Sequence, residues 1–401
     1  MTAALRQFDV IVLGAGAAGL MCAAVAGQRG RRVALLEHNG QVGRKILISG
    51  GGRCNFTNLH CGPGNFISEN KHFAKSALAL YQPANFIELV DRYLIPYHEK
   101  TLGQLFCDGS ARAIVEMLLA ECELASEMQG SVEIVLNAHG IQVEGAAGGG
   151  FRVACSAGEF DAGALVVATG GLSIPKMGAT GLGYELARQF GLEVIAPRPA
   201  LVPLLLGGAE ARWTELAGVA VDVVASAGGT RGESRFREKM LVTHRGLSGP
   251  AVLQASSYWR PGEELVIDFV PETDILATLT AQGARRDTAA LRQAFREVLP
   301  QRLSGFLAET GGPKGWSNSE LAACERGLHR WAFHPVGTEG FEKAEVTAGG
   351  VDTATLQART LEARNVPGLF FIGETVDVTG GLGGFNFQWA WASGVAAGRA
   401  V

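Results

Sequence analysis

One stretch near the start of the chain, residues 9–37, limits the possible folds more than any other part of the sequence. It reads D-V-I-V-L-G-A-G-A-A-G-L-M-C-A-A-V-A-G-Q-R-G-R-R-V-A-L-L-E. The apolar runs 10–13 and 33–36 predict two strands. Residues 15–28 between them have the small, helix-compatible composition of a helix that packs closely on a sheet. The order strand, glycine turn, helix, strand predicts an α/β fold.

The glycine turn of this stretch has the G-x-G-x-x-G spacing of a dinucleotide site. Gly14 permits the tight turn, Gly16 lets the backbone approach a pyrophosphate, and Gly19 lets helix and strand pack closely. The unpaired N–H groups at the start of the helix bind phosphates. Glu37 stands at the carboxyl end of the second strand, where it can accept hydrogen bonds from ribose hydroxyls. Its charge would repel a 2′-phosphate.

Two other interpretations of the stretch are open. A glycine turn of this kind also occurs as a structural feature of other α/β proteins. Residues 10–26 carry no charge, which is also typical of a signal peptide or a membrane span. However, the glycines fall at fixed turn positions, and the run is shorter than the ~20 residues that a span requires. We therefore expect dinucleotide binding and no membrane insertion.

The composition of the whole chain narrows the class of protein. A length of 401 residues predicts two or three domains, and 47% hydrophobic residues can build sizeable cores. With 18% charged residues and a net charge of −4, nothing suggests a general attraction to nucleic acid or acidic membranes. The seven cysteines form no C-x-x-C pair, which argues for a reducing compartment and against a zinc site or disulfide framework. With no targeting segment, we expect a cytoplasmic protein.

A second glycine motif follows in residues 43–58, G-R-K-I-L-I-S-G-G-G-R-C-N-F-T-N. Three consecutive glycines at 50–52 are costly to order. They allow the backbone to lie against a flat ligand, while Arg53 adds positive charge. A surface loop with solvated charges is the alternative. Cys54 has its nearest partner at Cys61, with six residues intervening, where flavin disulfide reductases use four. We expect Cys54 to be a small packed residue.

The middle of the chain mixes helical and strand patterns. Residues 72–99 predict helical segments interrupted at Pro83, and residues 110–126 predict a longer helix. Residues 132–169 predict short strands that return to the sheet as a β-meander, and residues 178–191 predict a glycine turn and a helix. Further strands are expected at 201–206, 219–225, 239–243 and 264–269, and further helices at 275–279, 288–299 and 318–331.

A mild basic cluster lies within this middle region. Its members are Arg231, Arg235, Arg237, Lys239 and Arg245. Glu233 and Glu238 dilute the positive charge, so we expect a solvated face here and no nucleic-acid site.

The end of the chain returns to an α/β pattern. Residues 366–372 predict a strand, which Gly373, Glu374 and Asp377 follow. Four glycines then precede F-N-F-Q-W-A-W, so a second helix opens with glycines directly after a strand. Its dipole favours negative charge at this end. Glu374 or Asp377 can accept hydrogen bonds from sugar-type hydroxyls, although these carboxylates could also simply cap the last helix.

Taken together, several motifs resemble one known family. They are G-A-G-A-A-G, S-G-G-G-R-C-N-F-T-N, A-T-G-G, T-H-R-G-L-S-G-P and G-E-T-V-D-V-T-G-G-L-G-G-F-N-F-Q-W-A-W. The chain is similar over nearly its whole length to the bacterial BaiN-like and YhiN-like NAD(P)/FAD-dependent oxidoreductases, a group that includes aminoacetone-oxidase-like flavoproteins. The motifs at 49–58 and 373–391 are far more specific than the first glycine turn.

The resemblance implies a glutathione-reductase-like FAD-binding Rossmann fold, interrupted by a β-barrel-like insert and a small helical domain. The expected bounds are 1–191 and 346–401 for the FAD-binding domain, 192–271 and 333–345 for the β-rich insert, and 272–332 for the helical sub-insert. Gly14, Gly16 and Gly19 would touch pyrophosphate and Glu37 the adenosine ribose. The residues expected to bind FAD are Gly14, Gly16, Ala17, Ala18, Gly19, Glu37, His38, Lys45, Gly51, Gly52, Arg53, Cys54, Asn55, Gly140, Ala168, Thr169, Gly170, Gly171, Gly373, Glu374, Asp377, Gly384, Phe385, Asn386 and Phe387.

The expected activity is that of an FAD-dependent oxidoreductase acting on a small-molecule substrate that the sequence does not identify. NAD(P)H could reduce the flavin transiently, since no second strand-linked G-x-G-x-x-G predicts a nicotinamide domain. A flavin amine oxidase that produces hydrogen peroxide is the alternative, and a nucleic-acid-modifying flavoprotein ranks below it. An NAD-only Rossmann dehydrogenase is disfavoured by the glycine-led last helix. No catalytic acid, base or metal ligand is assigned.

The expected mechanism therefore relies on the flavin itself. The last helix would aim its first N–H groups at the N1/C2 carbonyl side of the ring and stabilise the reduced anion there. Substrate would lie between the open face of the flavin and the insert, which would act as a lid.

Overall fold

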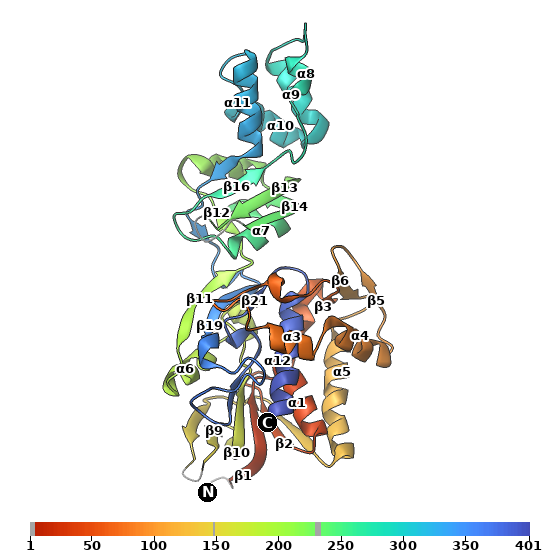
Figure 1. Cartoon of the computed structure of the whole chain (residues 1–401), viewed down its shortest axis with the longest axis vertical. Coiled ribbons are helices and arrows are strands. Elements are labelled where there is room, and N and C mark those ends of the chain that lie inside the picture. Colours follow the sequence, from red (N-terminus) through yellow and green to blue (C-terminus); the bar gives the residue numbers. More distant parts are fainter. Residues whose placement is uncertain (1–4, 147–148, 229–233) are drawn as a thin grey trace. The chain divides into compact units, whose positions relative to one another are not determined.

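The computed structural model describes residues 5–146, 149–228 and 234–401 (Figure 1). The chain forms two compact units. The first contains the residues up to Arg198 together with Val346–Val401, and the second is Pro199–Glu345. Each unit has a hydrophobic core of its own. Among the described residues, no helix combines the length and the apolar character needed to cross a membrane.

The first unit is built on a sheet with a parallel centre. Its parallel strands are β1 (Arg6–Leu13), β2 (Arg32–Leu36), β7 (Ser131–Val135), β10 (Gly158–Val167) and β20 (Leu369–Phe371). The register pairs Leu13 with both Leu36 and Val167, and pairs Val167 with Phe371. The carboxyl ends of these strands therefore meet at one edge, where ligands bind in open α/β sheets. The predicted Rossmann fold class is confirmed.

An antiparallel arm extends the same sheet. β8 (Gln142–Gly145) and β9 (Phe151–Cys155) pair with each other, and β9 pairs with β10. This is the β-meander expected from the sequence. Two small sheets lie apart from the main one. β3 (Asn55–Asn58), β6 (Gln104–Cys107) and β5 (Tyr97–Glu99) form the first, and β4 (Phe66–Ile67) pairs with β21 (Thr379–Gly380) in the second.

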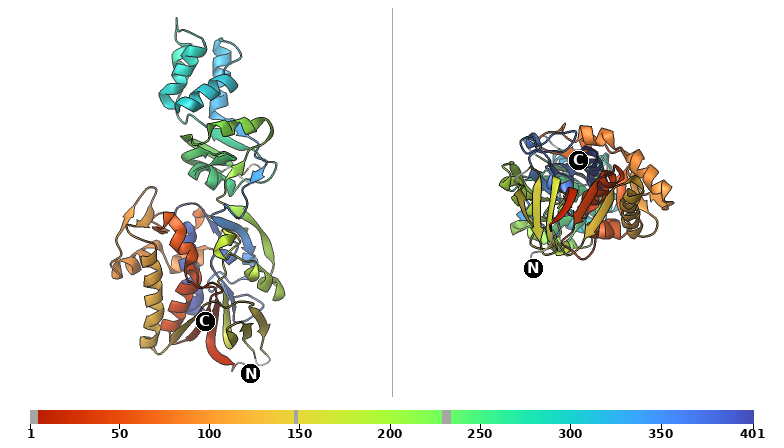
Figure 2. Two further views of the ribbon diagram at one scale, coloured as in Figure 1. Left: turned by 180° about the vertical axis from the view of Figure 1, so that it is seen from behind. Right: turned by 90° about the horizontal axis from the view of Figure 1, so that it is seen from below.

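Three long helices of the first unit pack side by side in Figures 1 and 2: α12 (Phe385–Ala400), α1 (Ala17–Gln28) and α5 (Arg112–Glu123). α1 and α12 approach closely because glycines face the neighbouring backbone. A Cβ at Gly394 would lie 2.6 Å from the carbonyl oxygen of Ala18. The shorter helices are α2 (Arg44–Ile48), α3 (Lys75–Leu80), α4 (Pro83–Arg92) and α6 (Leu182–Gln189). β11 (Val194–Ala200) forms a two-stranded sheet with β19 (Val346–Val351).

The second unit has a seven-stranded sheet in the order β17-β16-β13-β14-β15-β12-β18. Its strands are β12 (Leu204–Leu205), β13 (Ala220–Ala227), β14 (Ser234–Val242), β15 (Gly246–Ser248), β16 (Leu265–Asp268), β17 (Trp331–Phe333) and β18 (Gly337–Thr338). The helix α7 (Pro250–Ser256) packs against β13 and β14. The remaining helices are α8 (Ala277–Thr280), α9 (Thr288–Val298), α10 (Gln301–Thr310) and α11 (Asn318–His329).

The interruption expected at Pro83 is confirmed: α3 ends at Leu80, and Pro83 begins α4 because proline fits the first turn of a helix. Other expectations about secondary structure were wrong. Residues 97–99 are a strand. The strand expected over 201–206 is confined to Leu204–Leu205. α7 and α10 were not predicted. α7 begins at Pro250 and α10 directly follows Pro300, and proline in a sequence usually indicates a turn. Arg231, Glu233 and residues 147–148 of the glycine-rich turn lie outside the described residues.

Candidate cofactor site

The three glycines of the first motif have different surroundings. Gly14 has φ +100°, and a Cβ there would lie 2.6 Å from the carbonyl oxygen of Ala168. A Cβ at Gly19 would lie 1.9 Å from the carbonyl oxygen of Gly14. By contrast, a Cβ at Gly16 would meet no atom within 4 Å. Gly14 and Gly19 are therefore required for packing, whereas Gly16 keeps a space open in front of the first turn of α1.

The carboxylate of Glu37 is held beside this space. Glu37 is 6% exposed, and its Oε2 accepts a hydrogen bond from the backbone N–H of Ala15 at 2.8 Å. Its Oε1 accepts from the backbone N–H of Asn39 at 2.9 Å and lies 3.3 Å from Nδ1 of His38. The glycine turn thus fixes the acid at the end of β2.

The segment that follows β7 flanks the same acid. The N–H of Ala138 donates to the backbone carbonyl of Glu37 at 2.9 Å. Two residues later, Gly140 has φ +65°, and nothing lies within 4 Å of the position of a Cβ. The structure therefore brings Gly140 into the neighbourhood of Glu37.

Glu374 is the centre of a second polar cluster. Lys45 Nζ lies 2.8 Å from Glu374 Oε2 and donates to Ser173 Oγ at 2.7 Å. Ser173 Oγ donates to Glu374 Oε1 at 3.0 Å, and the N–H of Thr347 donates to the same oxygen at 2.7 Å. Lys45 and Glu374 were expected to bind the cofactor separately, but the structure joins them in an ion pair.

Sequence reasoning missed Ser173 and Thr347. Thr347 Oγ1 accepts hydrogen bonds from the N–H groups of Leu172 and Ser173 at 2.8 and 3.1 Å. These contacts place the end of the A-T-G-G motif against β19. Isolated serine and threonine residues carry no motif, so their role depends on contacts between distant segments.

The A-T-G-G motif itself follows β10. Gly170 has φ +74°, and a Cβ there would meet nothing within 4 Å. A Cβ at Gly171 would lie 2.5 Å from Thr347 Oγ1. Gly170 therefore leaves open space, whereas Gly171 allows the close approach of β19. Ala168 is buried against the first glycine turn, and the buried Oγ1 of Thr169 has no hydrogen-bond partner among the described residues.

The triple-glycine loop adopts left-handed backbone throughout. Gly50, Gly51 and Gly52 have φ values of +57°, +68° and +87°. A Cβ at Gly51 would meet nothing within 4 Å, and Arg53 is exposed beside it. Cys54 is fully buried, and burial raises the pKa of its thiol far above the ordinary value. Its thiol is therefore protonated and shielded, in agreement with a packed residue.

The first turn of α12 lies against β3. Gly384, with φ +93°, precedes the helix, and its Cβ would lie 2.4 Å from the carbonyl oxygen of Thr57. Asn58 Nδ2 donates to the carbonyl oxygen of Gly383 at 2.8 Å. Asn55 belongs to the same contact, since its side-chain amide would lie 2.8 Å from a Cβ at Gly384.

The residues at the start of α12 have different partners. The side chain of Asn386 accepts a hydrogen bond from the N–H of Gly380 and donates to the carbonyl oxygens of Gly380 and Gly381. It therefore holds the glycine loop in place. Phe385 packs edge-on against Phe66, and Phe387 stacks on Trp391. The first backbone bond of the helix runs from Gln388 to Gly384. The N–H groups before it are those that a helix start offers to a ligand.

Gly373 anchors α12 to the sheet. Its N–H donates to Ser393 Oγ at 3.0 Å, and its carbonyl accepts from Trp389 Nε1 at 2.9 Å. A Cβ at Gly373 would lie 2.9 Å from the side chain of Ala18 on α1. The residue therefore positions the neighbouring Glu374 through packing on both helices.

Asp377 belongs to a different part of the unit from the Glu374 cluster. Its Oδ2 accepts from the N–H of Glu69 at 2.9 Å and from Ser68 Oγ at 3.4 Å. The side chain is 4% exposed, and burial raises the pKa of its carboxyl. Its visible role is to hold the turn after β4.

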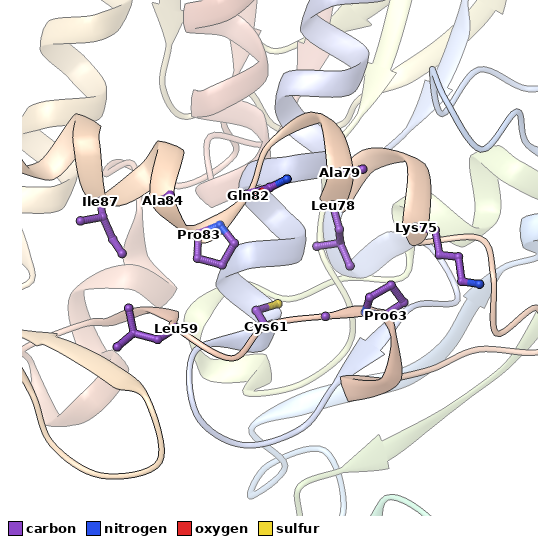
Figure 3. Close-up of a pocket in the computed structure, with 11 residues that line it drawn as sticks. Leu59, Cys61, Pro63, Lys75, Leu78, Ala79, Gln82, Pro83, Ala84 and Ile87 are labelled. Atoms are coloured by element: carbon purple, nitrogen blue, oxygen red, sulfur yellow. The ribbon is translucent and has the colours of Figure 1, made fainter.

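A groove of about 410 Å³ opens between the loop after β3 and the helices α3 and α4 (Figure 3). Leu59, Leu78 and Ile87 give it an apolar lining, with Cys61 and Lys75 also on its wall. Burial raises the pKa of Cys61 to about 12, so its thiol is neutral near pH 7. This groove was not predicted from the sequence.

In the described part of the second unit, three side chains of metal-ligand type lie together: Asp274, Glu325 and His329. Glu325 accepts hydrogen bonds from the N–H groups of Ile275 and Leu276 at 2.9 and 2.8 Å, and His329 Nδ1 lies 3.1 Å from Asp268. These contacts already join α11 to the segment before α8, so the cluster has a structural role.

The first unit fits the FAD expected from the sequence. Positions 16, 51, 140 and 170 are glycines where a side chain would meet no protein atom, so the backbone there can accept a bulky ligand. Glu37 supplies an acceptor for ribose hydroxyls, and the starts of α1 and α12 supply N–H groups for anionic groups. The described residues therefore provide both the space and the hydrogen-bonding groups that the cofactor requires.

Known proteins resemble this chain over nearly its whole length. The model of the HI0933-like protein Rossmann domain matches residues 8–400. The chain is 48% identical to the ribosomal RNA dihydrouridine synthase of Escherichia coli K12, over 97% of this chain and 96% of that protein. It is 30% identical to the 3-dehydro-bile acid delta(4,6)-reductase of Clostridium scindens, over 97% and 98% of the two chains.

A solved structure supports the fold. A quinol-fumarate reductase with menaquinol matches 99% of this chain and 71% of its own, with a TM-score of 0.50 and 16% identity. The family match, the enzymes among the relatives and the fold together identify an FAD-dependent oxidoreductase. The chain belongs to the HI0933-like family of Rossmann-domain proteins.

Proposed function

We propose that this protein reduces a uridine of ribosomal RNA to dihydrouridine, with NAD(P)H as the source of electrons. One observation carries the proposal: the 48% identity to a ribosomal RNA dihydrouridine synthase extends over nearly the full length of both chains. A shared cofactor domain alone would leave the second unit unmatched. The likeness includes Pro199–Glu345, a region that a common Rossmann core does not explain.

The names of two relatives point to one reaction class. Dihydrouridine is uridine with its C5=C6 bond reduced, and a delta(4,6)-reductase acts on carbon–carbon double bonds. In the proposed reaction, one ring carbon receives a hydride. The electron pair of the double bond forms a new C–H bond at the other carbon with a proton from solvent or protein. NAD(P)H is oxidised to NAD(P)⁺, so two electrons and two hydrogens are accounted for.

Bound FAD would supply hydride transfer between NAD(P)H and the uracil ring. The residues of this chain would bind and orient the cofactor. Glu37 would accept hydrogen bonds from the adenosine ribose, and the open space at Gly16 would admit the pyrophosphate at the start of α1. Lys45 and Glu374 form a fixed polar pair, and the start of α12 offers N–H groups to electron-rich oxygen.

The proposal reverses the ranking that the sequence suggested. Nucleic acid was disfavoured because the net charge is −4 and because glutamates dilute the basic cluster. Net charge sums over the whole surface, however, whereas an RNA substrate contacts one face. A global sum is therefore weak evidence against a local RNA site, and nearly full-length identity to an RNA-modifying enzyme outweighs it.

The test uses purified FAD-loaded protein, NADH or NADPH, and ribosomal RNA transcribed in vitro. We expect nucleoside mass spectrometry to detect dihydrouridine, heavier than uridine by two hydrogen atoms, in the complete mixture. Mixtures without NAD(P)H or without protein serve as controls. Ribosomal RNA that remains unreduced while NAD(P)H reduces the flavin would contradict the proposal.

The same preparation tests the amine oxidase alternative. An oxidase would release hydrogen peroxide in air with aminoacetone and without NAD(P)H. We expect no peroxide above the background of the free flavin. Release of peroxide that depends on the amine would favour the oxidase over the RNA-modifying enzyme.

A further inference from the structure

One face of β14 carries a row of exposed cations. Arg235, Arg237 and Lys239 are exposed and occupy alternate positions of the strand. Since side chains alternate across a strand, all three point to the same side of the sheet. Two residues of strand advance about 6.6 Å, so the charges are evenly spaced along a line. The sequence showed a cluster, but the strand arranges three of its members in a row.

The opposite face of the same strand is covered. Phe236 packs against Tyr258 with ring centroids 5.6 Å apart, and Met240 is fully buried. Gln254 of α7 donates to Glu238, the acid that seemed to dilute the cluster. Glu238 therefore points away from Arg237 and Lys239, towards α7. The charge dilution seen in the sequence does not extend to this face.

The acids that do share the cationic face are few among the described residues. Asp222 stands opposite Lys239 in the register, and Arg237 pairs with Glu272 at 3.0 Å. Both partners of the Arg237 pair are well exposed, so the pair is weak and exchangeable. Asp268, on β16, is engaged by His329 and by the N–H of Val270.

Arg235 completes the row at its end. No hydrogen bond or ion pair of Arg235 occurs within the described part of the chain, and Ser226 stands opposite it. Among the described residues, therefore, nothing competes with an external anion for its guanidinium. Arginine also binds phosphate with two parallel hydrogen bonds, which lysine cannot do.

We propose that this face of β14 binds the phosphodiester backbone of the RNA substrate. The proposal rests on the function proposed above. A line of evenly spaced cations suits a polymer with evenly spaced anions. No aromatic side chain occupies the row itself, so the face positions the RNA without reading its bases. The strand is rigid enough for this role, since β14 pairs with β13 along its length and with β15 at its end.

The experiment compares two variants of the full FAD-loaded protein. The first replaces Arg235, Arg237 and Lys239 with alanine. The matched control replaces Lys314, Arg326 and Arg330, three exposed cations elsewhere in the same unit. Binding of a fluorescent ribosomal RNA hairpin is measured by anisotropy over a range of salt concentrations. Flavin content and flavin reduction by NAD(P)H check that each variant remains intact.

We expect the first variant to bind RNA about tenfold or more weakly, with a salt slope reduced by about two or three. The control should keep both the affinity and the slope. The loss should be similar for hairpins of different sequence, because the contacts are to phosphates. A charge-preserving variant, Arg235→Lys, Arg237→Lys and Lys239→Arg, should keep the salt slope of the unaltered protein and bind RNA more tightly than the alanine variant does.

Two results would overturn the proposal, and they are distinguishable. If the unaltered protein binds and reduces RNA while the first variant keeps its salt slope, the phosphate site lies elsewhere and the proposed function stands. If the unaltered protein neither binds nor reduces RNA, the proposed function fails as well. Binding to anionic vesicles through these three residues, with no binding to RNA, would likewise contradict an RNA site.

Discussion

Lys45 Nζ lies 2.8 Å from Glu374 Oε2, although 329 positions of sequence separate the two residues. The pair connects α2 to the turn that follows β20, and Ser173 bridges both partners. It lies partly buried, with side-chain exposures of 36% for Lys45 and 19% for Glu374. The pair therefore joins the triple-glycine segment to the carboxyl edge of the sheet.

Breaking this pair should weaken both the fold and the cofactor site. We expect Lys45→Met and Glu374→Gln each to lower the free energy of unfolding by about 1–2 kcal/mol, since the pair is partly screened by solvent. In a double-mutant cycle, the coupling should be about 1 kcal/mol. Urea denaturation measures stability, and flavin fluorescence measures FAD affinity. Strictly additive effects would show that the pair contributes nothing.

The first glycine motif offers a matched pair of variants. Gly16→Ala fills open space, so we expect the apoprotein to lose less than about 1 kcal/mol, while FAD binds about tenfold or more weakly. Gly19→Ala places a methyl group 1.9 Å from the carbonyl oxygen of Gly14, so it should destabilise the apoprotein by about 3 kcal/mol. Thermal melts and FAD titrations separate the two effects. Equal losses of stability would contradict the distinct roles.

A substitution at Gly384 tests the contact between α12 and β3. A valine there would combine a left-handed backbone at φ +93° with a Cβ 2.4 Å from the carbonyl oxygen of Thr57. We expect Gly384→Val to cost about 3 kcal/mol or more of stability and to abolish FAD binding. Gly51→Asn, where the space is open, should cost about 1 kcal/mol in the apoprotein. Full stability of Gly384→Val with selective loss of FAD would show that the packing contact is dispensable.

Cys54 tests whether a thiol takes part in flavin chemistry. Burial raises the pKa of this thiol far above its ordinary value, so the thiol stays protonated. We therefore expect the rate of flavin reduction by NAD(P)H in Cys54→Ala to be within about twofold of the rate in the unaltered protein. The stability should fall by about 1 kcal/mol through lost packing. Anaerobic stopped-flow absorbance follows the flavin. A rate loss of orders of magnitude without loss of FAD would assign the thiol a redox role.

The raised pKa of Asp377 predicts that the stability of the protein depends on pH. Burial raises the pKa of its carboxyl above the ordinary value of 3.8, so the folded chain binds this proton more readily than the unfolded chain does. The contribution of this proton to the free energy of unfolding is therefore greatest below pH 3.8, and it declines as the pH rises through the pKa of Asp377 in the folded chain. Asp377→Asn removes this titration and keeps an acceptor for the N–H of Glu69.

The measurement is the difference in free energy of unfolding between Asp377→Asn and the unaltered protein at several pH values. We expect the variant to gain relative stability from pH 3.8 upwards and to reach a plateau near neutrality. A variant that instead loses relative stability as the pH rises would show that the charged carboxylate is favoured in the folded chain.

Local sequence patterns predicted those strands and turns whose conformation depends on neighbouring residues in the chain. The runs 10–13 and 33–36 became β1 and β2, and Gly14 adopts the turn that its lack of a Cβ permits. Backbone conformation, helix periodicity and strand alternation depend on neighbours in sequence. For that reason the Rossmann core and the set of residues near its edge could be predicted without coordinates.

Other features depend on distant segments and were not predictable. Ser173 reaches Glu374 from the segment after β10, and Thr347 reaches it from β19. Asp377 bonds to the turn after β4 instead of joining Glu374. Single polar residues have no period or motif, so only the packed chain shows which of them meet.

The sequence by itself determined the cofactor fold, the roles of its glycines and the acid at the end of β2, because these follow from the conformational limits of consecutive residues. Only the tertiary structure decided that Lys45 pairs with Glu374 and that Glu238 faces α7 while Arg235, Arg237 and Lys239 face outward together. The first arrangement depends on which distant segments meet in the folded unit, and the second depends on which face of β14 is buried. Both are decided by the packing of a whole unit.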